Sequence, residues 1–265
     1  MPRVTAIIPV YQPDPAILTR CLACVTPQVD AVILATEGRS ILPHGIPTDP
    51  RISVAHTPRC GIGFGANVNQ GATHAPQSTD WLLILNDDVF LNDDAVARML
   101  ETARPDTGIV VHLLRYQDGR IFSTVCARRP GDYDFSHVDH LAPQPTMHTV
   151  QEVENACGAS WLIRHDVWRR VHGYDESFFA YCEDNDLSMR VRQAGWKILY
   201  TPHAKGWHVG HQSMRLVGDL SALIRPSAAC FHAKWGDYLA WNRCRVPGNF
   251  DYLRQPTTPA YAPVT

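Results

Sequence analysis

The sequence lacks a long apolar run, an excess of charge of one sign and an internal repeat. Its 265 residues include 24 Lys and Arg against 26 Asp and Glu, for a formal net charge of -2. Binding to a nucleic-acid backbone needs a basic face, so this balance argues against nucleic acid as a partner. No stretch of about eighteen uninterrupted apolar residues occurs, so no membrane-spanning helix is expected. With 45% hydrophobic residues, the composition is that of a folded globular protein.

The N-terminus also lacks the features of a secretory signal. An apolar run begins at Val4, without a longer apolar stretch or a small-residue cleavage site. We therefore expect a cytoplasmic protein. The sequence leaves open both a peripheral contact with the inner face of a membrane and the oligomeric state.

The sequence also lacks two pairs of cysteines spaced as in a zinc site. Of the eight cysteines only Cys21 and Cys24 form a close pair, and no second pair stands at a matching distance. This pair falls in a predicted helix, where cysteine usually packs as a small apolar residue. We expect free thiols.

Short β-rich runs alternate with helical runs along the first half of the chain. Strands are predicted at 4–10, 31–35, 52–55, 81–85 and 108–114, and helices at 15–25, 64–74 and 93–102. This alternation is typical of an α/β fold with a doubly wound, mostly parallel sheet, whose ligands collect at the carboxyl ends of strands. Tyr11, Glu37 and the turn Asn86-Asp87-Asp88 would lie there.

The periodicity is lost at 117–150, where we expect a hairpin or loop excursion. It returns with a strand at 159–163, a short helix at 165–171, a helix ending at Gly195 and a strand at 197–200. The aromatic segment beyond Arg215 is predicted to be helical and could form an acceptor site, a dimer contact or a core. Residues 255–265 are predicted to be a loose tail.

Three segments carry candidate chemistry. The first is Asn86-Asp87-Asp88, which directly follows a buried strand. Mg²⁺ and Mn²⁺ prefer oxygen ligands, and Mg²⁺ is often bound by one or two carboxylates together with substrate phosphates. A metal bound here could stabilise a leaving diphosphate. An ordinary polar turn is an equally good interpretation of these residues alone.

The second segment is the aromatic run 178–181 followed by Glu183, Asp184 and Asp186. Carboxylates in a first helical turn are stabilised as anions, which suits a general base, although helix capping is the simpler interpretation. Adjacent residues cannot share one helical face, so Glu183 and Asp184 should differ in role. The third segment contains His203, His208 and His211 after the strand at 197–200, and histidine is a common metal ligand.

Together these segments resemble the inverting glycosyltransferases of family 2, which have the GT-A fold, and among them bacterial rhamnosyltransferase-like enzymes of surface polysaccharide assembly. The resemblance covers about residues 4–213. It is densest over Cys157-Gly158-Ala159, 173–179, Glu183-Asp184-Asn185-Asp186-Leu187, Arg190, 195–200 and His208.

The resemblance implies a catalytic domain over 1–215, with a nucleotide-sugar half to about 115 and an acceptor half after it, followed by a helical C-terminal segment at 216–265. It implies Asp184 as catalytic base with Glu183 beside it, and a divalent cation, Mn²⁺ or Mg²⁺, on Asp88 and His208. The donor would be a nucleoside-diphosphate sugar, and the acceptor a saccharide or lipid-linked saccharide. The implied nucleotide-sugar contacts are Pro9, Tyr11, Glu37, Gly63, Asn69, Asn86, Asp87, Gly158 and Ala159.

Two positions depart from the family pattern, and both lie in the nucleotide half. Thr36-Glu37-Gly38-Arg39 replaces the usual aspartate-asparagine-glycine turn, and Gly61 replaces the asparagine before Gly63-Phe64. These changes put the identity of the base in doubt. A glycoside hydrolase, which also uses two carboxylates, a sugar nucleotidyltransferase and a non-catalytic nucleotide-sugar-binding protein are the rival hypotheses.

Overall fold

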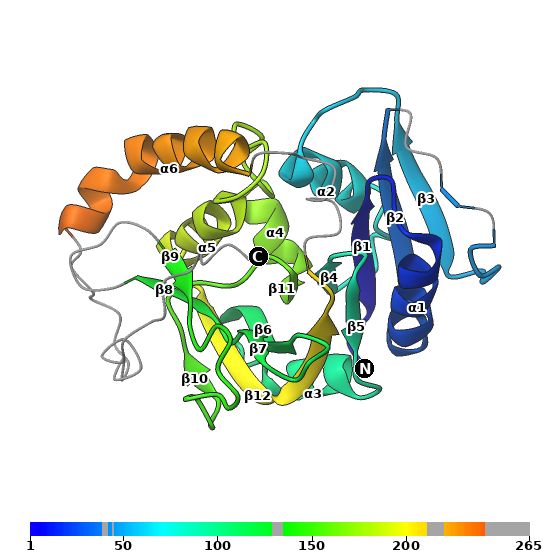
Figure 1. The fold of residues 1–265 in the computed structure, drawn as a ribbon, viewed down its shortest axis with the longest axis horizontal. Coiled ribbons are helices and arrows are strands. Elements are labelled where there is room, and N and C mark those ends of the chain that lie inside the picture. Colours follow the sequence, from blue (N-terminus) through cyan, green and yellow to red (C-terminus); the bar gives the residue numbers. More distant parts are fainter. Residues whose placement is uncertain (39–41, 44, 129–134, 211–219, 242–265) are drawn as a thin grey trace.

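A computed structural model describes residues 1–38, 42, 43, 45–128, 135–210 and 220–241 (Figure 1). The predicted turn residues Arg39 and Ser40, His211 and the tail at 255–265 lie outside these residues. In chain order the elements are β1 (Val4–Val10), α1 (Pro15–Val25), a 3-10 turn (Thr26–Gln28), β2 (Ala31–Glu37), β3 (Ile52–Thr57), α2 (Phe64–Ala72), β4 (Trp81–Leu85), β5 (Val89–Leu91), α3 (Ala95–Thr102), β6 (Thr107–Arg115), β7 (Ile121–Ser123), β8 (Cys126–Arg128), β9 (Phe135–His137), β10 (Gln151–Glu152), β11 (Ser160–Arg164), α4 (His165–Arg170), α5 (Glu183–Gln193), β12 (Lys197–His208) and α6 (Ser221–Trp241).

One large sheet organises the molecule. Its strand order is β10-β12-β6-β11-β4-β1-β2-β3, with β5 paired to β12 and β7 paired to β6. Strands β3, β2, β1 and β4 run parallel, as do β6 and β12, while β11 runs antiparallel between β4 and β6. The carboxyl ends of β1, β2, β4 and β6 therefore share one edge, as the sequence predicts.

Alternating side chains divide the core between the two faces of this sheet. Ile7 belongs to a cluster with residues of α2, α4 and α5, such as Val68, Val167 and Leu187. Its neighbours Ala6 and Ile8 pack on the other face with α1 and α3. The helices thus cover both faces, which makes the sheet doubly wound (Figure 1).

The clearest difference from prediction is the length of β12. The sequence suggests a strand ending at Tyr200 and a loop that holds the histidines, but β12 continues to His208. In its second half the side chains alternate between exposed His203, Lys205 and Trp207 and buried Ala204, Gly206 and His208. The buried positions hold two small residues and a histidine, so the alternation carries a weak hydrophobic signal.

The C-terminal helix α6 lies across α5, at the opposite end of the molecule from β3 (Figure 1). Phe231 and Trp235 of α6 are buried against Phe178 and Met189. Phe231 and Trp235 therefore form part of a core, which is one of the three roles that the sequence allows, whereas Tyr238 is exposed. Within the described residues, none of the helices combines the length and apolar character needed to cross a bilayer.

Candidate active site

The acidic turn Asn86-Asp87-Asp88 lies between β4 and β5, and these two strands pair with different strands of the sheet. Asn86 follows β4, and its backbone N–H donates to the carbonyl oxygen of Ala159 at 2.9 Å. After Asp88 the chain enters β5, which pairs antiparallel with the end of β12. This pairing places His208 opposite Val89, the residue that follows Asp88. Two segments 120 positions apart in the sequence therefore meet at the turn.

Asp88 and His208 form a buried contact. The Oδ1 atom of Asp88 lies 3.0 Å from Nε2 of His208, and Oδ2 accepts a hydrogen bond from the backbone N–H of Gly210 at 3.0 Å. Both side chains are buried. A separation of 3.0 Å equals that of two neighbouring ligands of one octahedral ion with bonds of about 2.1 Å. The geometry of this pair therefore fits a shared divalent cation.

The rest of the turn also suits a cation. Burial and then the charge of Asp88 raise the pKa of Asp87 to about 7. The side-chain oxygen of Asn86 is buried and has no hydrogen-bond partner among the described residues. Oxygen ligands and close negative charges are the chemistry that Mg²⁺ and Mn²⁺ prefer. Asp88 and His208 could hold such an ion, with Asn86 and Asp87 beside it.

The second carboxylate pair begins α5. Tyr181 and Cys182 precede it with φ of 70° and 65°, a left-handed conformation that costs non-glycine residues roughly 1 kcal/mol or more each. This turn orients Glu183 and Asp184 in different directions, as their adjacency predicts. Glu183 is buried beside Gly65 of α2, and its Oε2 has no partner among the described residues.

Asp184, in contrast, is partly exposed, and each of its carboxylate oxygens accepts a backbone hydrogen bond. Its Oδ2 accepts from the backbone N–H of Gly158 at 2.9 Å, and its Oδ1 accepts from that of Asn185 at 2.8 Å. Burial and the nearby charge of Cys157 raise its pKa to about 6. Burial and the charge of Asp184 raise the pKa of Glu183 to about 8. At neutral pH, Asp184 is therefore the carboxylate able to accept a proton.

Two consecutive residues join the acidic turn to α5. Gly158 holds the Asp184 carboxylate, and Ala159 accepts the hydrogen bond from Asn86. A Cβ atom at position 158 would lie 3.0 Å from both Cβ and Oδ2 of Asp184, so glycine permits the close approach. The Asp88 and Asp184 loops are thus connected through one dipeptide rather than lying on opposite sides of the molecule.

Three predicted nucleotide contacts have structural partners of their own. Glu37 accepts backbone hydrogen bonds from Gly61 and Ile62, at 3.1 and 2.9 Å, and so shapes the loop before Gly63. Gly63 has a φ of 87°, and a Cβ there would meet the carbonyl oxygen of Phe179 at 2.4 Å. These contacts join the loop before α2 to the segment before α5.

Asn69 makes a matching connection. Its side chain donates to the carbonyl oxygen of Tyr174 at 2.9 Å and accepts from the N–H of the same residue at 2.8 Å. Pro9 and Tyr11 lie at the end of β1; Pro9 is half-buried and Tyr11 is exposed. A nucleotide contact remains a prediction for all five residues.

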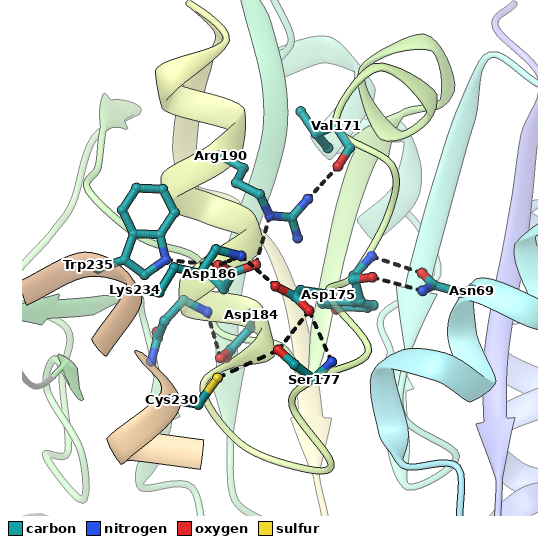
Figure 2. Close-up of polar contacts among 12 residues, drawn as sticks. Asn69, Val171, Asp175, Ser177, Asp184, Asp186, Arg190, Cys230, Lys234 and Trp235 are labelled. Carbon is teal, nitrogen blue, oxygen red and sulfur yellow. Dashed lines mark hydrogen bonds and ion pairs between the residues drawn. The ribbon is translucent and has the colours of Figure 1, made fainter. Parts of the chain in front are cut away.

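Helix α6 holds the segment before α5 from the other side, as Figure 2 shows. Lys234 forms ion pairs with Asp175 and Asp186, and the Trp235 indole N–H donates to Asp186 at 2.8 Å. Asp186 is fully buried and also pairs with Arg190 at 2.7 Å. The sequence marks Asp186 only as a possible cap, because its main partners lie about fifty residues further along the chain.

Sequence reasoning also missed a cluster of Cys126, His137 and Cys157. The three side chains lie close together, and one of them, Cys157, directly precedes Gly158 in the chain. No local spacing pattern joins them, since 11 positions separate Cys126 from His137 and Cys157 lies beyond a further loop. Gly210, whose N–H binds Asp88, likewise carries no signal without the strand pairing.

Known proteins of similar structure share this architecture. The structure of GalNAc-T7 with UDP, GalNAc and Mn²⁺ aligns with a TM-score of 0.63 and 15% identity, over 78% of this chain and 44% of that one. The mannosyltransferase PcManGT of Pyrobaculum calidifontis, in complex with GDP-Man and Mn²⁺, aligns with a TM-score of 0.55 and 16% identity, over 90% and 70% of the two chains. The fold is therefore that of the GT-A glycosyltransferases.

Sequence comparison narrows this class to a family. The family model described as "Glycosyltransferase like family 2" matches residues 2–225, and the chain belongs to that family. Rhamnosyltransferase WbbL of Escherichia coli is 26% identical over 178 residues, which are 58% of this chain and 63% of that protein. The N-acetylglucosaminyl-diphospho-decaprenol L-rhamnosyltransferase of Mycobacterium tuberculosis is 25% identical over 245 residues, which are 77% and 76% of the two chains.

Proposed function

We propose that the protein is an inverting, metal-dependent glycosyltransferase that moves a sugar from a nucleoside-diphosphate sugar to a hydroxyl group. The observation that carries this proposal is the connection of Asp88 and Asp184 through Gly158 and Ala159. One carboxylate stands in a turn suited to a cation, and the other has no cationic ion-pair partner among the described residues. This division of roles is what sugar transfer from a diphosphate donor requires.

On the donor side, Asp88 and His208 would hold the ion. When bound, a divalent ion stabilises the charge of a departing diphosphate. Asn86 and Asp87 lie in the same turn and would orient the ion and donor. Both structural relatives described above were determined with Mn²⁺ and a nucleotide or nucleotide sugar, which supports a similar requirement here.

On the acceptor side, Asp184 would take the proton of the attacking hydroxyl. Its backbone hydrogen bonds fix the carboxylate, and its pKa of about 6 keeps it ionised at neutral pH while leaving it basic enough to accept a proton. Direct attack on the anomeric carbon, opposite the leaving diphosphate, inverts its configuration. The buried Glu183 would act as a neighbour that shapes the site rather than as the base.

The sequence relatives suggest the sugar and the acceptor. Both are named rhamnosyltransferases, and the mycobacterial one acts on an N-acetylglucosaminyl-diphospho-lipid. We therefore infer transfer of rhamnose to a saccharide or lipid-linked saccharide, in bacterial surface polysaccharide assembly and on the cytoplasmic side of a membrane. Peripheral contact with the membrane would bring the enzyme to a lipid-linked acceptor.

A direct assay tests the proposal. Purified protein is incubated with a panel of nucleoside-diphosphate sugars that includes rhamnose donors, with and without a short-chain N-acetylglucosaminyl-diphospho-lipid and with Mn²⁺ or Mg²⁺. We expect release of nucleoside diphosphate that depends on the acceptor, and loss of that release in EDTA. Activity that survives EDTA would favour a hydrolase, and pyrophosphate-dependent synthesis of a sugar nucleotide would favour a nucleotidyltransferase. Donor binding without turnover of any acceptor would favour a binding protein.

A further inference from the structure

A buried cluster of two thiols and an imidazole lies beside the site but is not used by the proposed reaction. Cys126 of β8 and His137 of β9 stand directly opposite each other in an antiparallel hairpin. An isolated bridge between Cys126 and Asn155 brings in the segment that carries Cys157. The three possible ligand atoms all lie within 4.8 Å of one another. Three segments of the chain thus present them at one point.

The spacing within this cluster matches tetrahedral coordination. The Sγ atom of Cys126 lies 3.7 Å from Nδ1 of His137. For Zn–S bonds of about 2.3 Å and Zn–N bonds of about 2.0 Å, tetrahedral angles separate sulfur from nitrogen by roughly 3.5 Å and the two sulfurs by roughly 3.8 Å. The Cys126–His137 separation is within about 0.2 Å of the tetrahedral value. The other two separations are at most 4.8 Å, so movements of up to about 1 Å would let one ion contact all three atoms.

The chemistry of the ligands selects a different metal from the one proposed at Asp88. Two thiolates and an imidazole are soft and borderline ligands, which favour Zn²⁺ over Mg²⁺ or Mn²⁺. The two cysteines are buried and His137 is partly exposed, so an ion could reach the cluster from the histidine side. Both carboxylate oxygens of Asp184 accept backbone hydrogen bonds, and Asp184 does not belong to the cluster. We assign the fourth position of the ion to a water molecule.

We propose that Cys126, His137 and Cys157 form a zinc site that joins the β8–β9 hairpin to the segment holding Asp184. The ion would lock Cys157 in place, and with it the neighbouring Gly158, whose N–H holds the Asp184 carboxylate. The site would be structural and distinct from the ion at Asp88 and His208. It goes beyond the proposed function and does not depend on it.

Metal content tests this proposal without any activity assay. The full-length protein is purified with a thiol reductant and without chelator, supplied with one equivalent of Zn²⁺, desalted, and analysed for zinc. We expect about one zinc per chain, at least a fivefold loss in Cys126→Ser and Cys157→Ser, and no loss in Cys60→Ser, because Cys60 is exposed and outside the cluster. Asp88→Asn should also keep its zinc, which separates this site from the donor-side cation.

Cobalt gives a second readout that needs no variant. Wild-type protein loaded with Co²⁺ should show a thiolate-to-cobalt charge-transfer band in the near ultraviolet, which Zn²⁺ abolishes by displacement. Less than a tenth of an equivalent of zinc in the wild type, or the absence of the cobalt–thiolate band, would overturn the proposal. A Cys126–Cys157 disulfide in the protein as purified, found by mass spectrometry after its free thiols are alkylated without reductant, would overturn it too.

Discussion

The two carboxylate loops of the site are held in different ways. Asp88 contacts the imidazole of His208 at the end of β12 and the backbone amide of Gly210 just after it. Asp184 is held by the backbone amides of Gly158 and Asn185, and beside it the buried Glu183 has an oxygen without a partner among the described residues. In the first loop, the Asp88 carboxylate and the His208 imidazole can act together as metal ligands. In the second, backbone amides hold the Asp184 carboxylate next to the acidic Glu183.

This difference explains why two aspartates of the same chain can serve different chemistry. A carboxylate that faces an imidazole at ligand distance is prepared to bind a cation. A carboxylate whose pKa is raised by burial and negative neighbours accepts a proton more readily than an ordinary aspartate. The dipeptide Gly158-Ala159 contacts both loops, so it would fix the position of the proposed metal ligand relative to the proposed base.

The largest expected effect comes from removing the proposed base. Asp184→Asn keeps the size of the side chain but loses the ability to accept a proton, so transfer should fall by at least about a hundredfold. Donor binding, measured by thermal shift with nucleotide sugar and Mn²⁺, should stay near the wild-type value. Asp166→Asn, on α4, is the control for a simple loss of charge. An Asp184→Asn variant with more than a few per cent of wild-type activity would mean that the base is another residue.

The donor-side loop should respond to a change of metal ligand. Asp88→Asn should reduce transfer strongly and raise the Mn²⁺ concentration needed for half-maximal activity, since a neutral amide binds cations more weakly. His208→Gln should weaken metal affinity by at least the roughly 10–100-fold that loss of an outer-shell partner costs, because it removes a proposed direct ligand. His203→Gln is the matched control, because His203 lies on the same strand but is exposed. Equal metal requirements in the His208 and His203 variants would remove His208 from the metal site.

The dipeptide between the loops provides a more selective test. In Gly158→Ala the added Cβ would lie 3.0 Å from Cβ and Oδ2 of Asp184 and push this carboxylate from its position. The carboxylate would have to shift by a few tenths of an ångström, which is less than the misplacement of about 1 Å that costs roughly a hundredfold. We therefore expect kcat to fall severalfold to about tenfold, with a smaller change in the KM for donor. Gly236→Ala, where a Cβ meets nothing within 4 Å, should leave both values unchanged. A Gly158→Ala enzyme with normal kcat would show that Asp184 tolerates movement.

Most of the sheet could be predicted from sequence, whereas the connections between the site loops could not. The strands at 4–10 and 81–85 and the helix at 15–25 have the predicted bounds, because continuous apolar runs and the Asp14 cap before Pro15 are local signals. The short strand β5 and the second half of β12 have no such signal. They exist because they pair with each other, and this pairing brings His208 to Asp88. The proposed zinc ligands and the α6 partners of Asp186, Lys234 and Trp235, are likewise brought together only by tertiary contacts.

A smaller effect is expected from a change in helix α6, which packs against α5. Trp235→Phe keeps an aromatic ring in the core but removes the hydrogen bond to the buried Asp186. A bond to a charged group contributes about 1.5–3 kcal/mol, although Lys234 and Arg190 still compensate the charge. We expect Tm to fall by a few degrees and kcat by a few fold, with donor binding unchanged. Tyr238→Phe, an exposed change on the same helix, should have neither effect. A normal kcat at lowered Tm would limit α6 to a stabilising role.

The smallest expected change is in the Tm of a Glu183→Gln variant relative to the wild type, and this difference depends on pH. The pKa of Glu183 is raised from its usual 4.5 to about 8 in the folded protein. Between pH 4.5 and 8, Glu183 is ionised in the unfolded chain but still protonated in the folded protein. Ionisation therefore favours the unfolded chain, and the wild type loses stability as the pH rises from about 4.5 through about 8. Glu183→Gln carries no charge and avoids this loss. Its Tm should therefore equal or fall slightly below that of the wild type at pH 5 and exceed it by about 2–6 °C at pH 9. Glu101→Gln, an exposed change on α3, should show no such trend. A Glu183→Gln variant that is less stable than the wild type by the same amount at both pH values would mean that the Glu183 carboxylate is ionised and well solvated in the folded state.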